Sequence, residues 1–331
     1  MIFEEKPDKN NNSGRWAERA RELLEEQKNS WPLLKSNYDN LEKIITREIE
    51  FDSFNVKIQF NPERIKSSSA DVNEEAVRKR KCFLCAENLP AEQNSLSFNK
   101  HFVILCNPYP IFPEHFTISK KNHTPQTIIG NFAELLDLSK SLGKYYTIFY
   151  NGPKCGASAP DHMHFQAGTK AIMPIEYEFE KMVGRLARSV ISNGKIEVRF
   201  FEDHLRYIIS LESRTKGELL YAFKTFINAF KKISSPHDEP LMNIIAGFQE
   251  EIWRILIFPR QKHRPDQFFK SGEKQILISP AAVDMGGLFI TPRFEDFEKI
   301  KKEDIADILK QITVTKEYFE YLRKSIGGIF I

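Results

Sequence analysis

The chain has 331 residues, which is enough for two domains or for one large α/β unit with a well-buried core. Its hydrophobic content of 41%, charged content of 28% and formal net charge of +3 are ordinary for a globular protein, so they predict neither nucleic-acid binding nor a membrane-surface patch. Because the sequence has no run of about eighteen apolar residues, no apolar N-terminal segment and only four cysteines, we expect no membrane-spanning helix and a cytoplasmic protein.

Hydrophobic periodicity predicts the elements of the first half of the chain. Apolar residues recur at helical spacing over 14–29 and 38–46, whereas strict alternation from Phe54 to Phe60 is typical of a half-buried strand. The stretch 64–80 is rich in Ser, Lys and Arg, and we expect a loop there. The elements predicted after it are strands at 101–106 and 115–119, a helix at 124–142, and strands at 145–150 and 162–168.

The second half repeats the order of strand, helix and strand. A strongly amphipathic helix is predicted over 216–232. Around it we expect strands at 195–201, 206–211, 241–248, 252–258 and about 287–291, and a final helix at 302–325. This order fits the α+β class, with a sheet that helices cover on one side. It is compatible with a duplicated domain whose boundary lies near 170–180.

Two histidines in a predicted strand are the first candidates for chemistry. His162 and His164 lie two residues apart, so the alternation of a strand puts both imidazoles on one face, with Met163 and Phe165 on the apolar face. A neutral imidazole is a good nucleophile toward phosphorus, provided that its other nitrogen is held by a hydrogen-bond acceptor. The alternative is that the two histidines simply line a polar sheet face.

The residues around this pair favour the catalytic interpretation. Asn151, Gly156 and Ser158 lie in the loop just upstream, where small residues let backbone N–H groups approach an anion closely. Gln166 lies on the face of the two histidines and can donate to a phosphoryl oxygen. A glycine-containing loop alone is weak evidence, but here it leads directly into HMHFQ.

Cys82 and Cys85 have the two-residue spacing of a zinc knuckle. A tetrahedral site needs two more ligands, for which His123 and His162 are the best candidates and His115 is the reserve. Such a zinc would be structural, orienting the strand that carries the chemistry without activating water. The alternatives are a redox pair, which lacks the expected strand-to-helix context, and two incidental thiols.

A basic loop in the second half could bind phosphate or an incoming acceptor. It contains Arg260, Lys262, His263 and Arg264. Arg64 is a similar candidate from the first half. The alternative for each is a solvated surface charge.

The chemistry-bearing runs resemble the histidine-triad superfamily. They are the CxxC pair, NPYPIFPEHFTIS, NHTPQ and YNGPKCGASAPDHMHFQ, all within 80–170. The HxHxQ form is similar to the branch of hexose-1-phosphate uridylyltransferases, diadenosine tetraphosphate phosphorylases and GDP-hexose phosphorylases. The runs QFNPERIKSSSA (59–70) and SPAAVDMGGLFITPRFEDFEKI (279–300) also resemble GDP-hexose phosphorylases and extend the likeness over most of the chain.

This resemblance implies roles for particular residues. It makes His164 the nucleotidylated nucleophile and Cys82, Cys85, His123 and His162 the zinc ligands. It implies phosphate contacts for Asn151, Ser158 and Gln166. One departure is Asp161, inserted before the first histidine where relatives run from Pro to His, which leaves the register of the loop and the role of Ser158 open. Asp161 either orients an imidazole or, as we expect, ends the turn.

The sequence thus predicts an N-terminal helical segment at 1–50, a catalytic histidine-triad-like domain at 51–175 and a second, degenerate one at 176–331. The predicted activity is a nucleotidyltransferase or phosphorylase that acts on a nucleoside diphosphate-sugar or a dinucleoside polyphosphate. The acceptor would be phosphate or a sugar 1-phosphate, and a homodimer is possible in this branch. The alternatives are a nucleotide hydrolase, which uses water, and a non-catalytic zinc-stabilised nucleotide-binding protein.

Overall fold

The structure is a computed structural model and describes residues 2–3, 13–202, 205–233 and 238–327. The strands are β1 (Ile2–Phe3), β2 (Ile45–Glu50), β3 (Asn55–Phe60), β4 (Ser95–Phe98), β5 (Phe102–Cys106), β6 (His115–Lys120), β7 (Tyr146–Asn151), β8 (His164–Thr169), β9 (Ala187–Ser192), β10 (Ile196–Glu202), β11 (Tyr207–Ser213), β12 (Met242–Gln249), β13 (Ile252–Pro259) and β14 (Leu288–Thr291). The helices are α1 (Ser13–Ser30), α2 (Pro32–Leu41), α3 (Ile65–Ser68), α4 (Glu74–Lys79), α5 (Phe132–Leu142), α6 (Pro174–Leu186), α7 (Lys216–Lys231), α8 (Asp266–Phe269), α9 (Ala282–Met285), α10 (Phe294–Lys299), α11 (Lys302–Ile312) and α12 (Lys316–Gly327).

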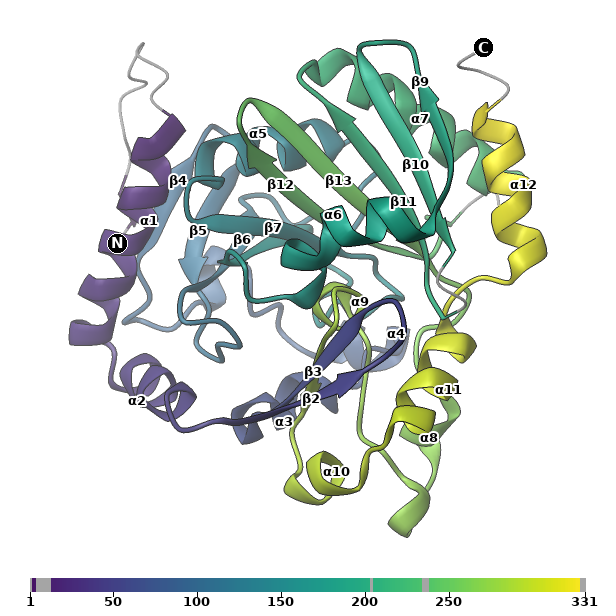
Figure 1. Ribbon diagram of the computed structural model, residues 1–331. Coiled ribbons are helices and arrows are strands. Elements are labelled where there is room, and N and C mark those ends of the chain that lie inside the picture. The colour runs from purple at the N-terminus through teal and green to yellow at the C-terminus, as the bar shows by residue number, and fades with distance from the viewer. Residues whose placement is uncertain (1, 4–12, 203–204, 234–237, 328–331) are drawn as a thin grey trace.

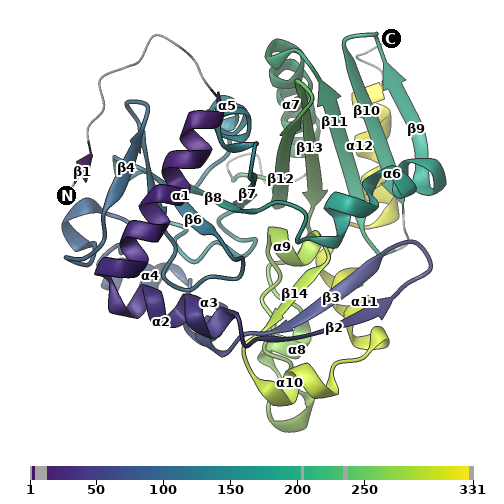
Figure 2. The same ribbon diagram turned by 60° about the vertical axis from the view of Figure 1, so that its left-hand side comes forward.

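One large sheet runs through both halves of the chain. It has eleven strands in the order β1-β4-β5-β6-β8-β7-β12-β13-β11-β10-β9, and its neighbours are antiparallel except for β1 and β4 (Figures 1 and 2). The two halves meet where β7 pairs with β12, with Asn151 opposite Asn243. A large antiparallel sheet with covering helices confirms the predicted α+β class.

The two halves have the same strand order. Apart from the short β1 at one outer edge, the first half runs toward the centre as β4-β5-β6-β8-β7 and the second as β9-β10-β11-β13-β12. In each, the last two strands are exchanged relative to their order in the chain. In chain order, a helix also lies at the same place in each half: α5 precedes β7, and α7 precedes β12.

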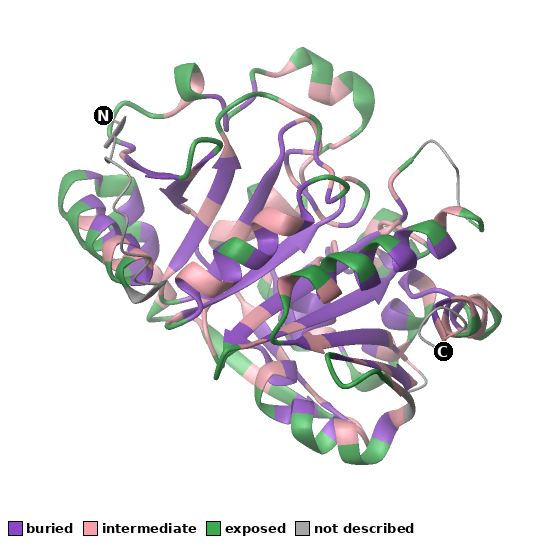
Figure 3. Cartoon of the chain, turned by 90° about the horizontal axis from the view of Figure 1, so that it is seen from above, coloured by how far each residue is buried: buried purple, intermediate pink, exposed green. Residues whose placement is uncertain are grey.

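The sheet has an apolar core on each face, so the prediction that helices cover one side only is wrong. On one face, α1, α5, α7 and α12 pack against the strands. On the other face lie α6, α9, α10 and α11 with a small sheet of order β14-β3-β2. In Figure 3 the strands are mostly buried, whereas the outer sides of the helices are exposed. None of the described helices is long and apolar enough to cross a membrane.

Alternation along the central strands separates the two faces. In β7, Ile148 and Tyr150 belong to the first core, whereas Phe149 belongs to the second. In β8, Phe165 and Ala167 belong to the first core. The residues between them therefore face the second side, where they can meet chain from the C-terminal half.

Two predicted helices are wrong in their extent. The helix predicted at 38–46 ends at Leu41 as α2, which begins earlier, at Pro32, because proline favours the first turn and Trp31 before it is extended. Its predicted end lies in β2. The helix predicted at 302–325 is two helices, α11 and α12. They separate because Thr313 is extended and forms an isolated β-bridge with Arg260.

Other predicted elements also differ from the structure. The helix predicted from 124 begins only at Phe132, after Gly130, whose φ of 83° interrupts a helix. The predicted loop at 64–80 contains the short helices α3 and α4. Helix α6 was missed, although Pro174 in its first turn and the Glu176 side chain bonded to the Met173 N–H are recognisable start signals. The strands β2, β4 and β9 were also missed.

The small sheet joins strands that lie far apart in the chain. Strand β3 pairs in parallel with β14, more than two hundred residues later in the chain, as the register Phe60 to Thr291 shows. In Figure 1 this small sheet lies below the large one, beside α11. The segment that follows the predicted boundary at 175 therefore contributes to the same layer as the beginning of the predicted catalytic domain.

Candidate active site

A cavity of about 530 Å³ opens on the second face of the large sheet. Five of the residues expected at a phosphate-binding site line it together: Asn151, Gly156, Ser158, His164 and Gln166. The C-terminal half completes the wall with Ser279, Ala281, Asp284 and Ile290. Residues separated by more than a hundred positions thus enclose one space.

His164 is the first residue of β8 and is only 4% exposed. Its Nδ1 lies 2.8 Å from the carbonyl oxygen of His162, an acceptor that fixes the proton on Nδ1. Nε2 is therefore the unprotonated nitrogen of the ring. Burial lowers the pKa of His164 to about 4, which keeps the imidazole neutral at physiological pH.

The backbone of His164 is held by Gln126, a residue that the sequence did not single out. The His164 N–H donates to Gln126 Oε1 at 2.8 Å. Gln126 Nε2 in turn donates to the carbonyl oxygens of His164 at 3.1 Å and of Asn151 at 2.8 Å. Because Gln126 is only 3% exposed, these bonds form away from competing water. One side chain thereby fixes the ends of β7 and β8 relative to each other.

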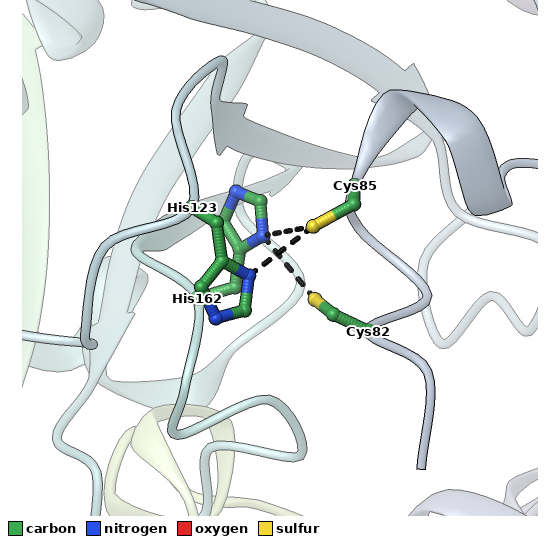
Figure 4. A group of neighbouring side chains, drawn as sticks. All are labelled: Cys82, Cys85, His123 and His162. Carbon is green, nitrogen blue, oxygen red and sulfur yellow. Dashed lines mark hydrogen bonds between the residues drawn. The ribbon is translucent and has the colours of Figure 1, made fainter. Parts of the chain in front are cut away.

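Two thiols and two imidazoles converge beside this cavity (Figure 4). The Sγ atom of Cys82 lies 3.2 Å from His162 Nδ1, and that of Cys85 lies 3.1 Å from His123 Nδ1. The four candidate ligand atoms all lie within 4.8 Å of one another. Around a tetrahedral zinc, a nitrogen and a sulfur ligand are about 3.5 Å apart, so this donor set fits such an ion.

The ring of His162 already has the tautomer that a metal ligand needs. Its Nε2 lies 2.7 Å from the carbonyl oxygen of Lys120, so Nε2 carries the proton and Nδ1 directs its lone pair at the thiols. The prediction placed His162 in the strand, but it lies in the turn just before β8. The burial of Cys85 beside Cys82 raises the pKa of Cys85 to about 11, as expected for thiols with no neighbouring cation.

Asp161, the insertion relative to the family pattern, ties this turn to the cysteine-bearing segment. Its carboxylate forms an ion pair with Arg80, two residues before Cys82. Both side chains are largely buried, with exposures of 18% for Asp161 and 26% for Arg80. Asp161 is thus a link between two loops and does not bond to an imidazole.

Gln166 is oriented by His115, the reserve metal ligand of the sequence analysis. The Nδ1 of His115 accepts from the Ile111 N–H at 3.3 Å, so its Nε2 carries the proton and donates to Gln166 Oε1 at 2.9 Å. Burial, and then the Arg64 charge, lower the pKa of His115 to about 3, so it stays neutral. The Gln166 amide nitrogen is left as the group that can donate into the cavity. His115 lies outside the thiol–imidazole cluster.

The loop after β7 approaches the C-terminal half very closely. Gly156 has a φ of 92°, and a Cβ atom there would lie 2.6 Å from the Cβ of Ala281. Asn151 accepts two hydrogen bonds at Oδ1, from Asn243 Nδ2 at 2.9 Å and from the Ala282 N–H at 2.7 Å. Glycine and asparagine therefore occupy these positions because the second half lies directly against them.

The structure places the basic candidates in three different environments. Arg64 lines the cavity, where its Nη1 donates to the Tyr109 carbonyl at 2.9 Å. Arg260 and Lys262 are not among the residues that line the cavity. Arg260 is 2% exposed and bonds to backbone carbonyls and to Asn243, whereas Lys262 is paired with Asp266 at the surface.

Several cavity and support residues could not be recognised in the sequence: Arg80, Gln126, Asn243 and Asp284. Gln126 and Asp284 lie in runs that resemble the family, NHTPQ and SPAAVDMGG, and those runs are the only signal available. Arg80 lies in a stretch interpreted as a loop, and Asn243 in an apolar predicted strand. Their partners are distant in the chain, so spacing cannot reveal them.

Comparisons with known proteins agree with this architecture. Residues 23–169 match a family model described as a domain of unknown function, DUF4922, and residues 238–330 match one described as the GDPGP1-like, C-terminal domain. Among curated proteins, none matches the sequence.

Solved structures with the same fold include yeast Ap4A phosphorylase Apa2. Its TM-score is 0.56 at 14% identity, covering 85% of this chain and 96% of that chain. The same enzyme in complex with AMP gives a TM-score of 0.54, at 14% identity over 88% of this chain and 96% of that chain. In complex with Ap4A its TM-score is 0.52, at 14% identity over 86% of this chain and 97% of that chain. At this identity the likeness shows the fold.

Proposed function

We propose that this chain transfers a nucleotidyl group through a covalent bond to His164, as a phosphorylase or nucleotidyltransferase of the histidine-triad type. Its fold, which it shares with yeast Ap4A phosphorylase, and the match of residues 238–330 to a GDPGP1-like C-terminal domain support this proposal. The observation that carries this proposal is the hydrogen bond from His164 Nδ1 to the His162 carbonyl at 2.8 Å. It supports a neutral ring whose Nε2 lone pair is available in a cavity that amide and hydroxyl side chains also line.

The proposed reaction is a double displacement. His164 Nε2 attacks the α-phosphorus of the substrate; a P–N bond forms, and the P–O bond to the leaving phosphate group breaks. An oxygen of the acceptor phosphate then attacks the same phosphorus, and the P–N electron pair returns to Nε2. Ser158, Gln166 and Asn151 would donate to the equatorial oxygens as charge redistributes over them.

The substrate would be a nucleoside diphosphate-sugar or a dinucleoside polyphosphate, and the acceptor phosphate or a sugar 1-phosphate. The fold shared with Apa2, which has been solved with AMP and with Ap4A, supports a nucleotide. The range that matches the GDPGP1-like domain includes the run 279–300, whose residues line the cavity wall.

We propose zinc as the ion for the site of Cys82, Cys85, His123 and His162. Two thiolates and two imidazoles are the soft and borderline ligands that zinc prefers. The ion would supply no chemistry to the transfer. It would hold His162, and thereby the carbonyl that orients His164.

The two halves are proposed to be a duplicated domain. The identical strand orders of β4–β8 and β9–β13 support this, as does the position of α5 and α7. The sequence of the second half contains no HxH pair. Its contribution would be the cavity wall, through Ser279, Ala281 and Asp284.

The decisive experiment is intact-protein mass spectrometry after brief incubation with UDP-, GDP- and ADP-hexoses and diadenosine polyphosphates, without phosphate. We expect a nucleoside-monophosphate adduct on the wild type and none on His164→Gly. The matched control is His101→Gly, which removes an exposed histidine in the turn just before β5 and should keep the adduct.

Two outcomes would contradict the proposal. Nucleotide binding without an adduct and without turnover indicates a binding protein. Turnover by His164→Gly, or turnover that needs no phosphate acceptor, indicates a hydrolase.

A further inference from the structure

Arg260 is a buried cation outside the cavity, with no carboxylate among its hydrogen-bond partners. It directly follows β13 and is 2% exposed. Its five hydrogen bonds go to the carbonyl oxygens of Ile312, Pro280, Lys262 and His263 and to the side-chain oxygen of Asn243. All five N–H donors of the guanidinium are thus used. Burying a charge among neutral acceptors is unfavourable for stability, so its role deserves a functional explanation.

The Asn243 amide connects this cation to the junction of the two halves. Arg260 Nη1 donates to Asn243 Oδ1 at 2.5 Å. Asn243 Nδ2 donates to Asn151 Oδ1 at 2.9 Å and to the Cys155 carbonyl at 2.7 Å. Asn243 is fully buried on β12, directly opposite Asn151 of β7 in the central strand pair.

The direction of these bonds determines the orientation of Asn151. Its Oδ1 is occupied by two donors, Asn243 Nδ2 and the Ala282 N–H. Its Nδ2 is therefore turned away from both of them, and Asn151 lines the cavity that contains His164. The Asn243 and Asn151 amides both accept at oxygen and have nitrogen as the donor. The two amide dipoles between Arg260 and the cavity therefore point in the same direction.

We propose that Arg260 is a positioning residue that, through Asn243, orients and polarises the Asn151 amide as a hydrogen-bond donor to the phosphoryl group being transferred. A cation at the head of a chain of hydrogen bonds strengthens each bond along it in a low-dielectric interior. The second half of the chain thereby acts on the reaction without touching the substrate. This inference rests on the proposed function and assigns Arg260 a role other than the phosphate clamp that the sequence suggested.

The test is a double-mutant cycle on the full-length protein, measuring the rate of adduct formation at saturating nucleotide. We expect Arg260→Met to lower this rate about 10- to 100-fold, the range for weakening one preorganised donor, with little change in nucleotide affinity. In the Asn151→Ala background, the same substitution should have no further effect, because its target is gone. Arg260→Lys, which keeps the charge, should recover part of the rate.

Arg254→Gln is the matched control. Arg254 lies on β13, the strand that leads to Arg260. It pairs with Glu212 and Glu180 and does not line the cavity, so the rate should be unchanged. Because Arg260→Met removes many bonds, Asn243→Asp provides an isosteric second variant. It replaces the donor to Asn151 by an acceptor and should lower the rate at least as much as Arg260→Met.

Selective ¹⁵N labelling of asparagine gives a readout that does not depend on activity. The Asn151 side-chain resonance, assigned by its loss in Asn151→Ala, should shift in Arg260→Met and not in Arg254→Gln. An unchanged resonance, or rate losses that multiply in the double mutant, would overturn the inference. If the wild type forms no adduct, the proposed function is contradicted instead. The resonance shift then still tests whether Arg260 orients the Asn151 amide through Asn243.

Discussion

The backbone carbonyl of His162 accepts the Nδ1–H of His164 at 2.8 Å, while the imidazole Nδ1 of His162 faces Cys82 Sγ at 3.2 Å. One residue therefore connects the thiol–imidazole cluster to the candidate nucleophile. Its ring belongs to the cluster, and its main chain sets the tautomer of its neighbour. Any displacement of the ring will move the carbonyl that orients His164.

We predict that the protein binds one zinc ion per chain, and that losing it weakens adduct formation about 10- to 100-fold, as expected for a group that orients a reacting residue. Cys82→Ser should lower both the zinc content and the rate, because it removes one of the four ligands. Elemental analysis and the adduct assay measure the two effects. Cys155→Ala, which removes a buried thiol outside the cluster, should retain the metal; full activity in metal-free protein would contradict the coupling.

His115→Phe should slow the transfer because Gln166 loses the donor that fixes its amide. The oxygen of the half-buried Gln166 would then lack its partner at 2.9 Å, a loss of about 1 kcal/mol in the free energy of unfolding. We expect the rate of adduct formation to fall about tenfold or more. Denaturant unfolding and single-turnover kinetics measure the two effects, and an unchanged rate would show that the Gln166 orientation does not matter.

The pH dependence of stability should also change in His115→Phe. The folded pKa of His115, about 3, lies below its unfolded value near 6.5, so the unfolded chain binds more protons between these two values. Stability from this residue is therefore complete above about pH 6.5 and is lost as the pH falls toward 3. Unfolding curves at pH 7 and pH 4.5 should show a smaller difference for the variant than for the wild type.

Asp284 should make nucleotide binding weaker at alkaline pH. Burial raises its pKa to about 7, despite N–H donors from Ala281 and Ile290, so it is neutral in mildly acid solution and charged above. Since the folded pKa exceeds the unfolded value of 3.8, its stability contribution is present at low pH and is lost as the pH rises through 7. A carboxylate in the cavity wall would then repel an anionic ligand.

The measurement is the dissociation constant of the nucleotide between pH 6 and pH 8.5. We expect it to rise several-fold for the wild type and to stay level for Asp284→Asn, which keeps a side-chain oxygen as acceptor. Parallel pH profiles for the two proteins would assign the effect to another group.

Gly156→Ala should disrupt the loop after β7. The substitution places a methyl group 2.6 Å from the Ala281 Cβ at a φ of 92°, and both effects are unfavourable. We expect a loss of about 1–3 kcal/mol in the free energy of unfolding and weaker nucleotide binding. Gly184→Ala, in α6 with open space around the new Cβ, should instead be neutral or stabilising by about 0.5–1 kcal/mol.

Much of the candidate site could be predicted because its residues lie in short local patterns. The spacing of Cys82 and Cys85 and the alternation around His164 follow from local geometry, and the structure brings the four predicted ligands together. The amphipathic helix predicted at 216–232 is α7. Strand boundaries were predicted to within about a residue for β3, where alternation is strict, and also for the more continuously apolar β13.

Prediction was wrong where a distant partner overrode local preference. The final helix divides at Thr313 because that residue bridges to Arg260, and nothing in the residues around Thr313 announces the bridge. For Arg260 the sequence left two interpretations open, a phosphate-binding residue and a solvated surface charge, and neither anticipates a buried guanidinium. Its burial depends on four carbonyl groups from segments around 262, 280 and 312.

The sequence by itself identified the candidate nucleophile, the candidate metal ligands and the Gly156 loop, because each of them lies in a short contiguous run. Only the tertiary structure decided how these residues are supported. Asn151 and Asn243 are 92 residues apart and become partners solely because β7 pairs with β12. Such pairing depends on the packing of both sheet faces at once, a property of the whole chain that no local spacing contains.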